Sequence, residues 1–226
     1  MKTLILILLI TFTLSYSQTF EVVKLNGTVK ILSGNSNSWQ DLKTNMKINS
    51  NSIISTDKNS YVKIKGNDLI FTLKESSAIS VANIKKMSLD ELILALAMED
   101  IMDTPMKKRN DKSDNTGVYG DKVTGETLKT IKSNDFGLKR LNGAKQLAEN
   151  GMKESAIVAA KEIFRKYPET KKDAGNRIYF ADLLNDRGLY EEAYDEFNQI
   201  KSLQLTTEQN SYTENKLDEI AKKLIK

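Results

Sequence analysis

Apolar and polar residues tend to alternate between residues 20 and 83, with the period of a strand that buries one face. The alternation is clearest at residues 28–31, 61–65 and 69–73, where β-branched residues are frequent. Short clusters of Asn, Gly, Asp and Ser separate the runs and favour antiparallel hairpins. The pattern predicts a small all-β domain over residues 18–85, built as a sandwich or roll.

The period changes in the last hundred residues. Over residues 127–226 apolar positions recur every three or four residues, and glycine or proline separates one group from the next. This spacing predicts antiparallel helices joined by short turns. The fold class expected for the chain is therefore α+β multidomain, with an N-terminal all-β domain and a C-terminal all-α helical repeat.

The helical region also matches itself at an offset of 37 residues, as in Ala156 and Ala193. The positions that match are Ala144 with Ala181, Leu147 with Leu184, Gly151 with Gly188, and Ala156 with Ala193. Small residues allow two helices to approach closely, and a glycine ends the first helix of each pair. A last helix over residues 207–225 is expected to cap the array.

Between the two regions, Ser88 followed by Asp90 and Glu91 predicts the start of a helix over residues 89–102. This helix is apolar around most of its circumference, so we expect it to pack between other elements. It forms a connecting segment, residues 86–103. The polar residues 104–126 that follow are interpreted as a linker.

Residues 1–17 have the order of an export signal. Lys2 precedes an apolar run that is too short to span a bilayer, and Ser15-Tyr16-Ser17 forms a small-x-small cleavage site. We expect cleavage near Ser17–Gln18, a periplasmic or secreted location, and no stable membrane anchor after cleavage.

The composition excludes several classes of chemistry. The 226 residues contain no cysteine and no histidine, and the formal net charge is +4. Disulfides, thiolate metal sites and Ser-His-Asp or Cys-His catalysis are therefore excluded, and the charge gives no field for nucleic acid. Catalysis by carboxylates or lysine alone is not excluded. We expect no enzyme, no catalytic residue, no cofactor and no metal site.

The β region resembles FecR-type domains. The order of small, β-branched and turn residues carries the resemblance, and Trp39 is its most diagnostic point. The matching segments are residues 25–29, Trp39, Leu42, 48–56, 59–64, 71–73 and 76–79. The resemblance implies a periplasmic β module without catalytic residues. Trp39 is interpreted as a core residue, with stacking on sugar or peptide as the alternative.

The helical region resembles the tetratricopeptide repeat. Residues 188–193 (GLYEEA) are close to that family's most recognisable stretch, and Pro168 lies where its second helix ends. The chain departs from the family in its longer period, since the usual repeat has about 34 residues, and in having two clear copies. The resemblance implies a protein-binding scaffold. Partner contacts are assigned to Arg140, Lys145, Asn176, Arg177 and Tyr179, with a solvated helix face as the alternative for each.

Together these features predict an exported, non-enzymatic bacterial envelope scaffold that binds another envelope protein or peptide through its helical repeats. The alternative is a cell-wall or glycan-binding protein that uses Trp39 and the surface of the β-domain. The sequence leaves the oligomeric state open.

Overall fold

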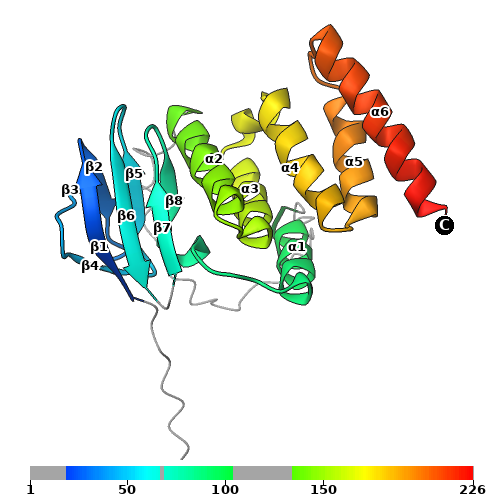
Figure 1. The fold of residues 1–226 in the computed structure, drawn as a ribbon. Coiled ribbons are helices and arrows are strands. Elements are labelled where there is room, and N and C mark those ends of the chain that lie inside the picture. The colour runs from blue at the N-terminus through cyan, green and yellow to red at the C-terminus, as the bar shows by residue number, and fades with distance from the viewer. Residues whose placement is uncertain (1–18, 67–68, 104–133, 226) are drawn as a thin grey trace, which may run out of the picture.

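The computed structural model describes residues 19–66, 69–103 and 134–225. The predicted signal peptide, the 104–126 linker and the first residues of the predicted helical region lie outside this part of the chain. Within it the fold is mixed α+β, with two small antiparallel sheets followed by six α-helices (Figure 1).

Each sheet has four strands drawn from alternating stretches of the chain. The first sheet has the order β4 (Lys47–Asn49), β1 (Thr19–Asn26), β6 (Tyr61–Gly66) and β7 (Leu69–Leu73). The second sheet has the order β3 (Gln40–Asp41), β2 (Val29–Leu32), β5 (Ile53–Thr56) and β8 (Ala78–Ser80). All pairings are antiparallel.

The alternation seen in the sequence is confirmed by burial. Val62 and Ile64 of β6 are buried while Tyr61 and Lys63 are not, and the inward residues of both sheets belong to one apolar cluster. The turn predicted at Asn26-Gly27 is also present. Gly27 has a φ of 72°, a conformation that favours glycine.

The helical half consists of α1 (Leu89–Asp103), α2 (Asn134–Glu149), α3 (Lys153–Lys166), α4 (Ala174–Asp186), α5 (Tyr190–Ile200) and α6 (Thr207–Leu224). Two short 3-10 helices complete it, η1 (Val81–Asn83) and η2 (Pro168–Lys172). The helices predicted at residues 89–102 and 207–225 correspond to α1 and α6. Pro168 begins η2 just after α3, so it does follow the end of the second helix as predicted.

The turns α2–α3 and α4–α5 have the same geometry, 37 residues apart. Gly151 and Gly188 have φ angles of 79° and 78°. In each turn the residue after the glycine donates its backbone N–H to a leucine carbonyl five residues earlier, Met152 to Leu147 and Leu189 to Leu184. This is the Schellman arrangement that ends a helix at a left-handed glycine.

The alanines of the internal match lie where the paired helices touch. Ala144 and Ala156 are fully buried, and so are Ala181 and Ala193. Helix α2 packs on α3, and α4 packs on α5. The close approach expected from the small residues is therefore present in both hairpins.

Helix α2 joins the helical half to the two sheets. Asn142 Nδ2 donates to the Ser76 carbonyl (2.9 Å), and Gln146 Oε1 accepts the backbone N–H of Lys74 (2.7 Å). A Cβ atom at Gly143 would collide with the carbonyl oxygen of Ala78. Helix α2 thus covers β7 and β8, the edge strands at one end of each sheet, and protects them from pairing with other chains.

Trp39 also lies at this junction. Its ring meets the ring of Phe136 on α2 edge to face, with 5.8 Å between centroids, and the side chain is half-buried. The interpretation of Trp39 as a residue of the β core is therefore wrong, because its main aromatic neighbour belongs to the helical half. One continuous apolar cluster runs through both halves.

The elements stand in a row. The two sheets lie at one end, followed by α2 and α3 with α1 beside them, then α4 and α5, with α6 at the other end (Figure 1). Each helical hairpin therefore has a neighbour on both sides, which repeat units need in order to bury their faces.

Candidate protein-interaction surface

Helix α1 exposes a large apolar side to solvent. Leu94 is 64% exposed and Ile101 is 74% exposed. The exposed large apolar residues of this helix are Leu89, Ile93, Leu94, Met98, Ile101 and Met102. We call this set the outer face of α1. Contiguous apolar patches of this kind mark interaction sites on soluble proteins.

The opposite side of α1 is anchored to α3. Leu92 and Leu96 are buried, and Arg165 Nε donates to Glu99 Oε2 at 2.8 Å. Before the helix starts, Ser155 Oγ donates to the Lys85 carbonyl (2.5 Å). The expected packing of α1 between other elements is thus met on one side only. The sequence does not reveal that one side of α1 is exposed, because a helix that is apolar on all sides gives no sign of which side is covered.

The start of α1 is fixed by a capping box. The backbone N–H of Ser88 donates to Glu91 Oε2 (2.7 Å), and the backbone N–H of Glu91 donates to Ser88 Oγ (3.2 Å). The bond from the Ser88 backbone lowers the pKa of Glu91 below its ordinary value, so this carboxylate is charged at neutral pH. All charged residues of α1 are acidic: Asp90, Glu91, Glu99, Asp100 and Asp103.

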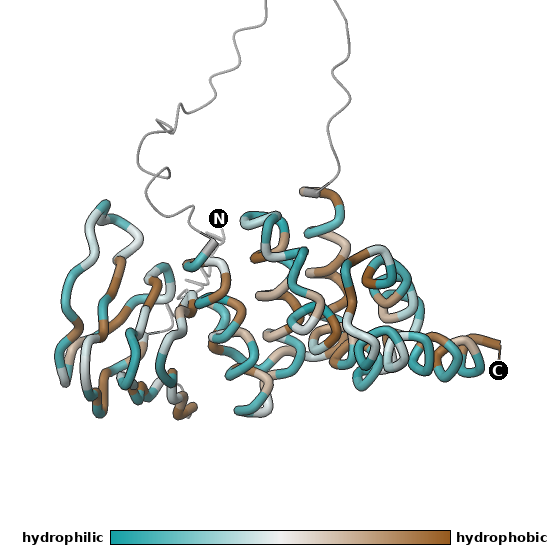
Figure 2. Tube along the Cα trace, turned by 90° about the horizontal axis from the view of Figure 1, so that it is seen from above, coloured by the Kyte–Doolittle hydropathy of each residue, from teal (hydrophilic) through white to brown (hydrophobic). Residues whose placement is uncertain are grey.

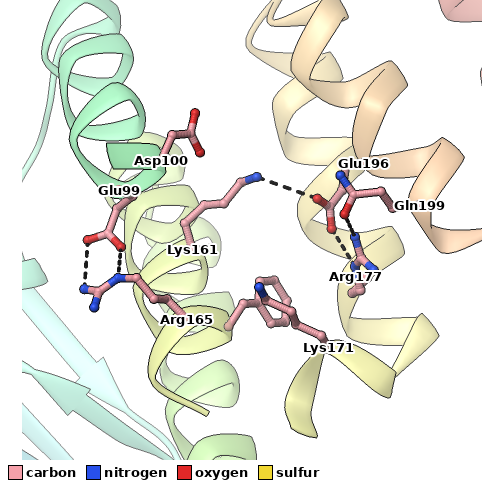
Figure 3. Close-up of a pocket in the computed structure, with 9 residues that line it drawn as sticks. Glu99, Asp100, Lys161, Arg165, Lys171, Arg177, Glu196 and Gln199 are labelled. Atoms are coloured by element: carbon pink, nitrogen blue, oxygen red, sulfur yellow. Dashed lines mark hydrogen bonds and ion pairs between the residues drawn. The ribbon is translucent and has the colours of Figure 1, made fainter. Parts of the chain in front are cut away.

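A polar pocket of about 150 Å³ opens beside the C-terminal part of α1 (Figure 3). It is lined by Glu99, Asp100, Lys161, Phe164, Arg165, Lys171, Arg177, Glu196 and Gln199. Arg177 Nε donates to Glu196 Oε1 at 2.6 Å, and Lys161 Nζ lies 3.6 Å from Glu196 Oε2. Since Glu99 is also paired, with Arg165, acidic and basic groups largely neutralise each other here. The lining residues can donate and accept hydrogen bonds to a polar ligand.

Two of the predicted contact residues lie together at the surface. Lys145 of α2 places its Nζ 5.2 Å from the ring centroid of Tyr179 on α4, and both side chains are partly exposed. Burial raises the pKa of Tyr179. This pair joins neighbouring hairpins with a cation over an aromatic ring.

The other three predicted residues are buried. Arg140 is 4% exposed and lies 3.6 Å from Glu162. Arg177 is 6% exposed and bonds to α5 as described above. Asn176 is also buried, and its backbone N–H donates to Asp173 Oδ1 (2.9 Å) at the start of α4. In this structure Arg140 and Arg177 form ion pairs between helices, and the backbone of Asn176 takes part in the cap of α4.

Glu162 shows how Arg140 acts on its surroundings. Burial alone would raise the pKa of Glu162, but the positive charges of Arg140 and Lys166 outweigh it and lower the pKa. Lys166 Nζ donates to Glu162 Oε1 at 2.6 Å. The carboxylate therefore stays charged between two cations, as in other ion-pair networks that shape a fold.

A polar cluster that links α4 to α6 was not predicted from the sequence. The Tyr212 hydroxyl donates to Asp182 Oδ2 (2.9 Å), and Lys216 Nζ lies 3.6 Å from Asp182 Oδ1. Burial raises the pKa of Asp182, and burial together with the bond to Asp182 raises the pKa of Tyr212. Asp182 lies 30 positions before Tyr212 and 34 before Lys216, and nothing in the local pattern joins it to them.

Two properties of the described residues bear on ligands and membranes. Across residues 19–66, 69–103 and 134–225, no group of three or more His, Cys, Asp or Glu side chains is arranged to hold a metal ion. None of the helices in that part of the chain has the length and apolar character needed to cross a bilayer.

Comparison with known proteins does not assign a function to these residues. No family model, no curated protein and no solved structure matches the chain. The function is therefore argued from the outer face of α1 and the residues around it.

Proposed function

We propose that this chain is an exported, non-enzymatic scaffold of the bacterial cell envelope that binds another envelope protein through its helical half. Export is supported by the order of charge, apolar run and small residues in residues 1–17. The resemblance of the β half to FecR-type domains supports the same compartment. The equal turns at Gly151 and Gly188 support the resemblance of the helical half to tetratricopeptide repeats.

The outer face of α1 is the observation that carries the proposal. Leaving one large apolar side chain in water forgoes about 1.5–3 kcal/mol of burial free energy. Helix α1 leaves six such residues exposed while it is anchored by a capping box, two buried leucines and an ion pair. A fixed helix with an uncovered apolar side is suited to hold a partner.

The surface beside α1 adds polar contacts. The pocket at Glu99 and Lys161 lies next to the C-terminal part of the helix, where a bound segment would meet both signs of charge (Figure 3). Protein interfaces combine such an apolar centre with a polar rim.

A retention experiment tests the proposal. The mature chain, residues 18–226, is immobilised and exposed to detergent-solubilised envelope from its own bacterium and, separately, to purified peptidoglycan. We expect one envelope protein to be retained by the wild type and lost with Leu94→Asn/Met98→Asn. The control Ile70→Asn, an exposed apolar residue on β7, should retain it.

Retention of peptidoglycan in place of a protein would contradict the scaffold and favour the glycan-binding alternative. If the protein retained by the wild type is retained equally by the α1 double variant, the outer face of α1 is not the surface that binds it.

A further inference from the structure

We infer that the partner segment received by α1 is a basic amphipathic helix of another protein, an inference that rests on the proposed function. Its grounds are the shape of the outer face and the sign of the charges on α1. Both come from residues that are fixed in the fold.

The outer face has the form of a helix-docking surface. Ile93, Ala97 and Ile101 follow one another at intervals of four residues, and Leu94, Met98 and Met102 form the adjacent row. Side chains at this spacing lie one above another on a helix. Two parallel rows make ridges with a groove between them, and the small Ala97 at the centre lets a second helix approach closely. The 15 residues of α1 span about 22 Å, so a partner helix of about four turns would cover the face.

The charges of α1 select a basic partner. Asp90 and Glu91 are exposed at its N-terminal end. Helix α1 contains no lysine and no arginine. A partner with Lys or Arg beside its apolar stripe would therefore be attracted, whereas an acidic partner would be repelled.

The same charges count against two other occupants. A second copy of α1 would add only further acidic side chains to the interface, and like charges across an interface oppose association. A membrane surface rich in anionic lipid repels them as well. The partner helix is thus the occupant that the described residues favour.

The direct test uses two synthetic 18-residue helical peptides as probes, one of Leu and Lys and one of Leu and Glu in the same pattern. Fluorescence anisotropy measures their binding to the mature chain. We expect the Leu/Lys peptide to bind, with affinity that falls as salt is raised, and the Leu/Glu peptide to bind at least about tenfold more weakly.

Variants assign the binding to α1. Leu94→Asn/Met98→Asn should lower the affinity for the Leu/Lys peptide by about 50-fold or more, because two large apolar contacts are lost. Asp90→Asn/Glu91→Gln should lower the same affinity about two- to tenfold, since exposed charges contribute modestly to binding and Gln at position 91 keeps the capping box. Glu208→Gln/Asp218→Asn on α6 removes the same number of exposed acids and should leave binding unchanged.

Equal binding of the two peptides, or Leu/Lys binding that neither α1 variant weakens, would overturn the inference. So would self-association of the chain that Leu94→Asn/Met98→Asn abolishes in sedimentation, or binding to anionic vesicles that the same change removes. The proposed function and the basic helix are tested by different results. If the α1 double variant loses its envelope protein but peptide charge has no effect, the scaffold stands and the basic helix does not.

Discussion

Helices α1 and α6 are built alike and differ in what they show to solvent. Both start with a capping box, Ser88 with Glu91 in α1 and Thr206 with Gln209 in α6. Both bury a few apolar residues on one side. Outward, α6 is mainly charged and polar, whereas α1 is mainly apolar. The trace of α6 accordingly carries more teal, and that of α1 more tan and brown (Figure 2).

The difference separates a helix that ends an array from a helix that continues one. A terminal helix needs an outer face that water can solvate, and α6 has it. Helix α1 has the anchoring of a terminal helix with the surface of an internal one. The described part of the chain leaves its outer face exposed, and the partner that we propose would cover it.

The largest expected effect tests whether both helices are equally anchored. Leu92→Ala in α1 and Ile220→Ala in α6 each remove a fully buried side chain, so each should lower the free energy of unfolding by about 2–4 kcal/mol. Met98→Ala, on the outer face, should change it by about 0.5 kcal/mol or less. Urea denaturation followed by circular dichroism measures all three. A large loss from Met98→Ala would mean that the outer face is covered within the chain.

A smaller effect concerns the polar ties of the two helices. Glu99→Gln removes the charge that pairs with Arg165, and Tyr212→Phe removes the hydroxyl that binds Asp182. We expect a loss of about 1–2 kcal/mol for the first, whose partners are largely buried, and about 0.5–1 kcal/mol for the second. A double-mutant cycle with Arg165→Gln checks that the first loss comes from the ion pair. No coupling between the two positions would contradict its role in anchoring α1.

The smallest effect is a difference in pH response between the caps. The pKa of Glu91 in the folded chain lies below the ordinary 4.5, so its contribution is fully present above pH 4.5 and is lost as pH falls through the folded pKa. Gln209, in the cap of α6, does not titrate. Amide exchange followed by NMR should therefore show the first turn of α1 loosening in acid before the first turn of α6. Glu91→Gln should remove the difference, and equal loosening of both turns would contradict this account.

Several elements followed directly from the sequence. Period-two alternation predicted strands such as β6, and the glycines at 151 and 188 predicted the ends of α2 and α4, because both patterns depend on residues close together in the chain. The placement of partner residues did not follow. A buried arginine such as Arg177 and an exposed one look the same in a helical pattern until the neighbouring helix is known.

The contacts that join the β half to the helical half could not be predicted from the sequence either. Asn142 and Gln146 are polar and lie on α2, so their pattern suggests a solvated face. Their partners are a backbone carbonyl at Ser76 and a backbone N–H at Lys74, groups that every residue has. No sequence pattern marks such contacts.

Site-specific photo-crosslinking in the living bacterium tests the central claim most directly. A photoreactive residue is placed at 93, 94, 97, 98, 101 and 102 on α1 and, as controls, at the exposed positions 214 and 218 on α6. The account predicts that one envelope protein is crosslinked from the α1 positions and not from α6. Crosslinks from α6 with none from α1, or no reproducible protein product from either helix, would contradict it.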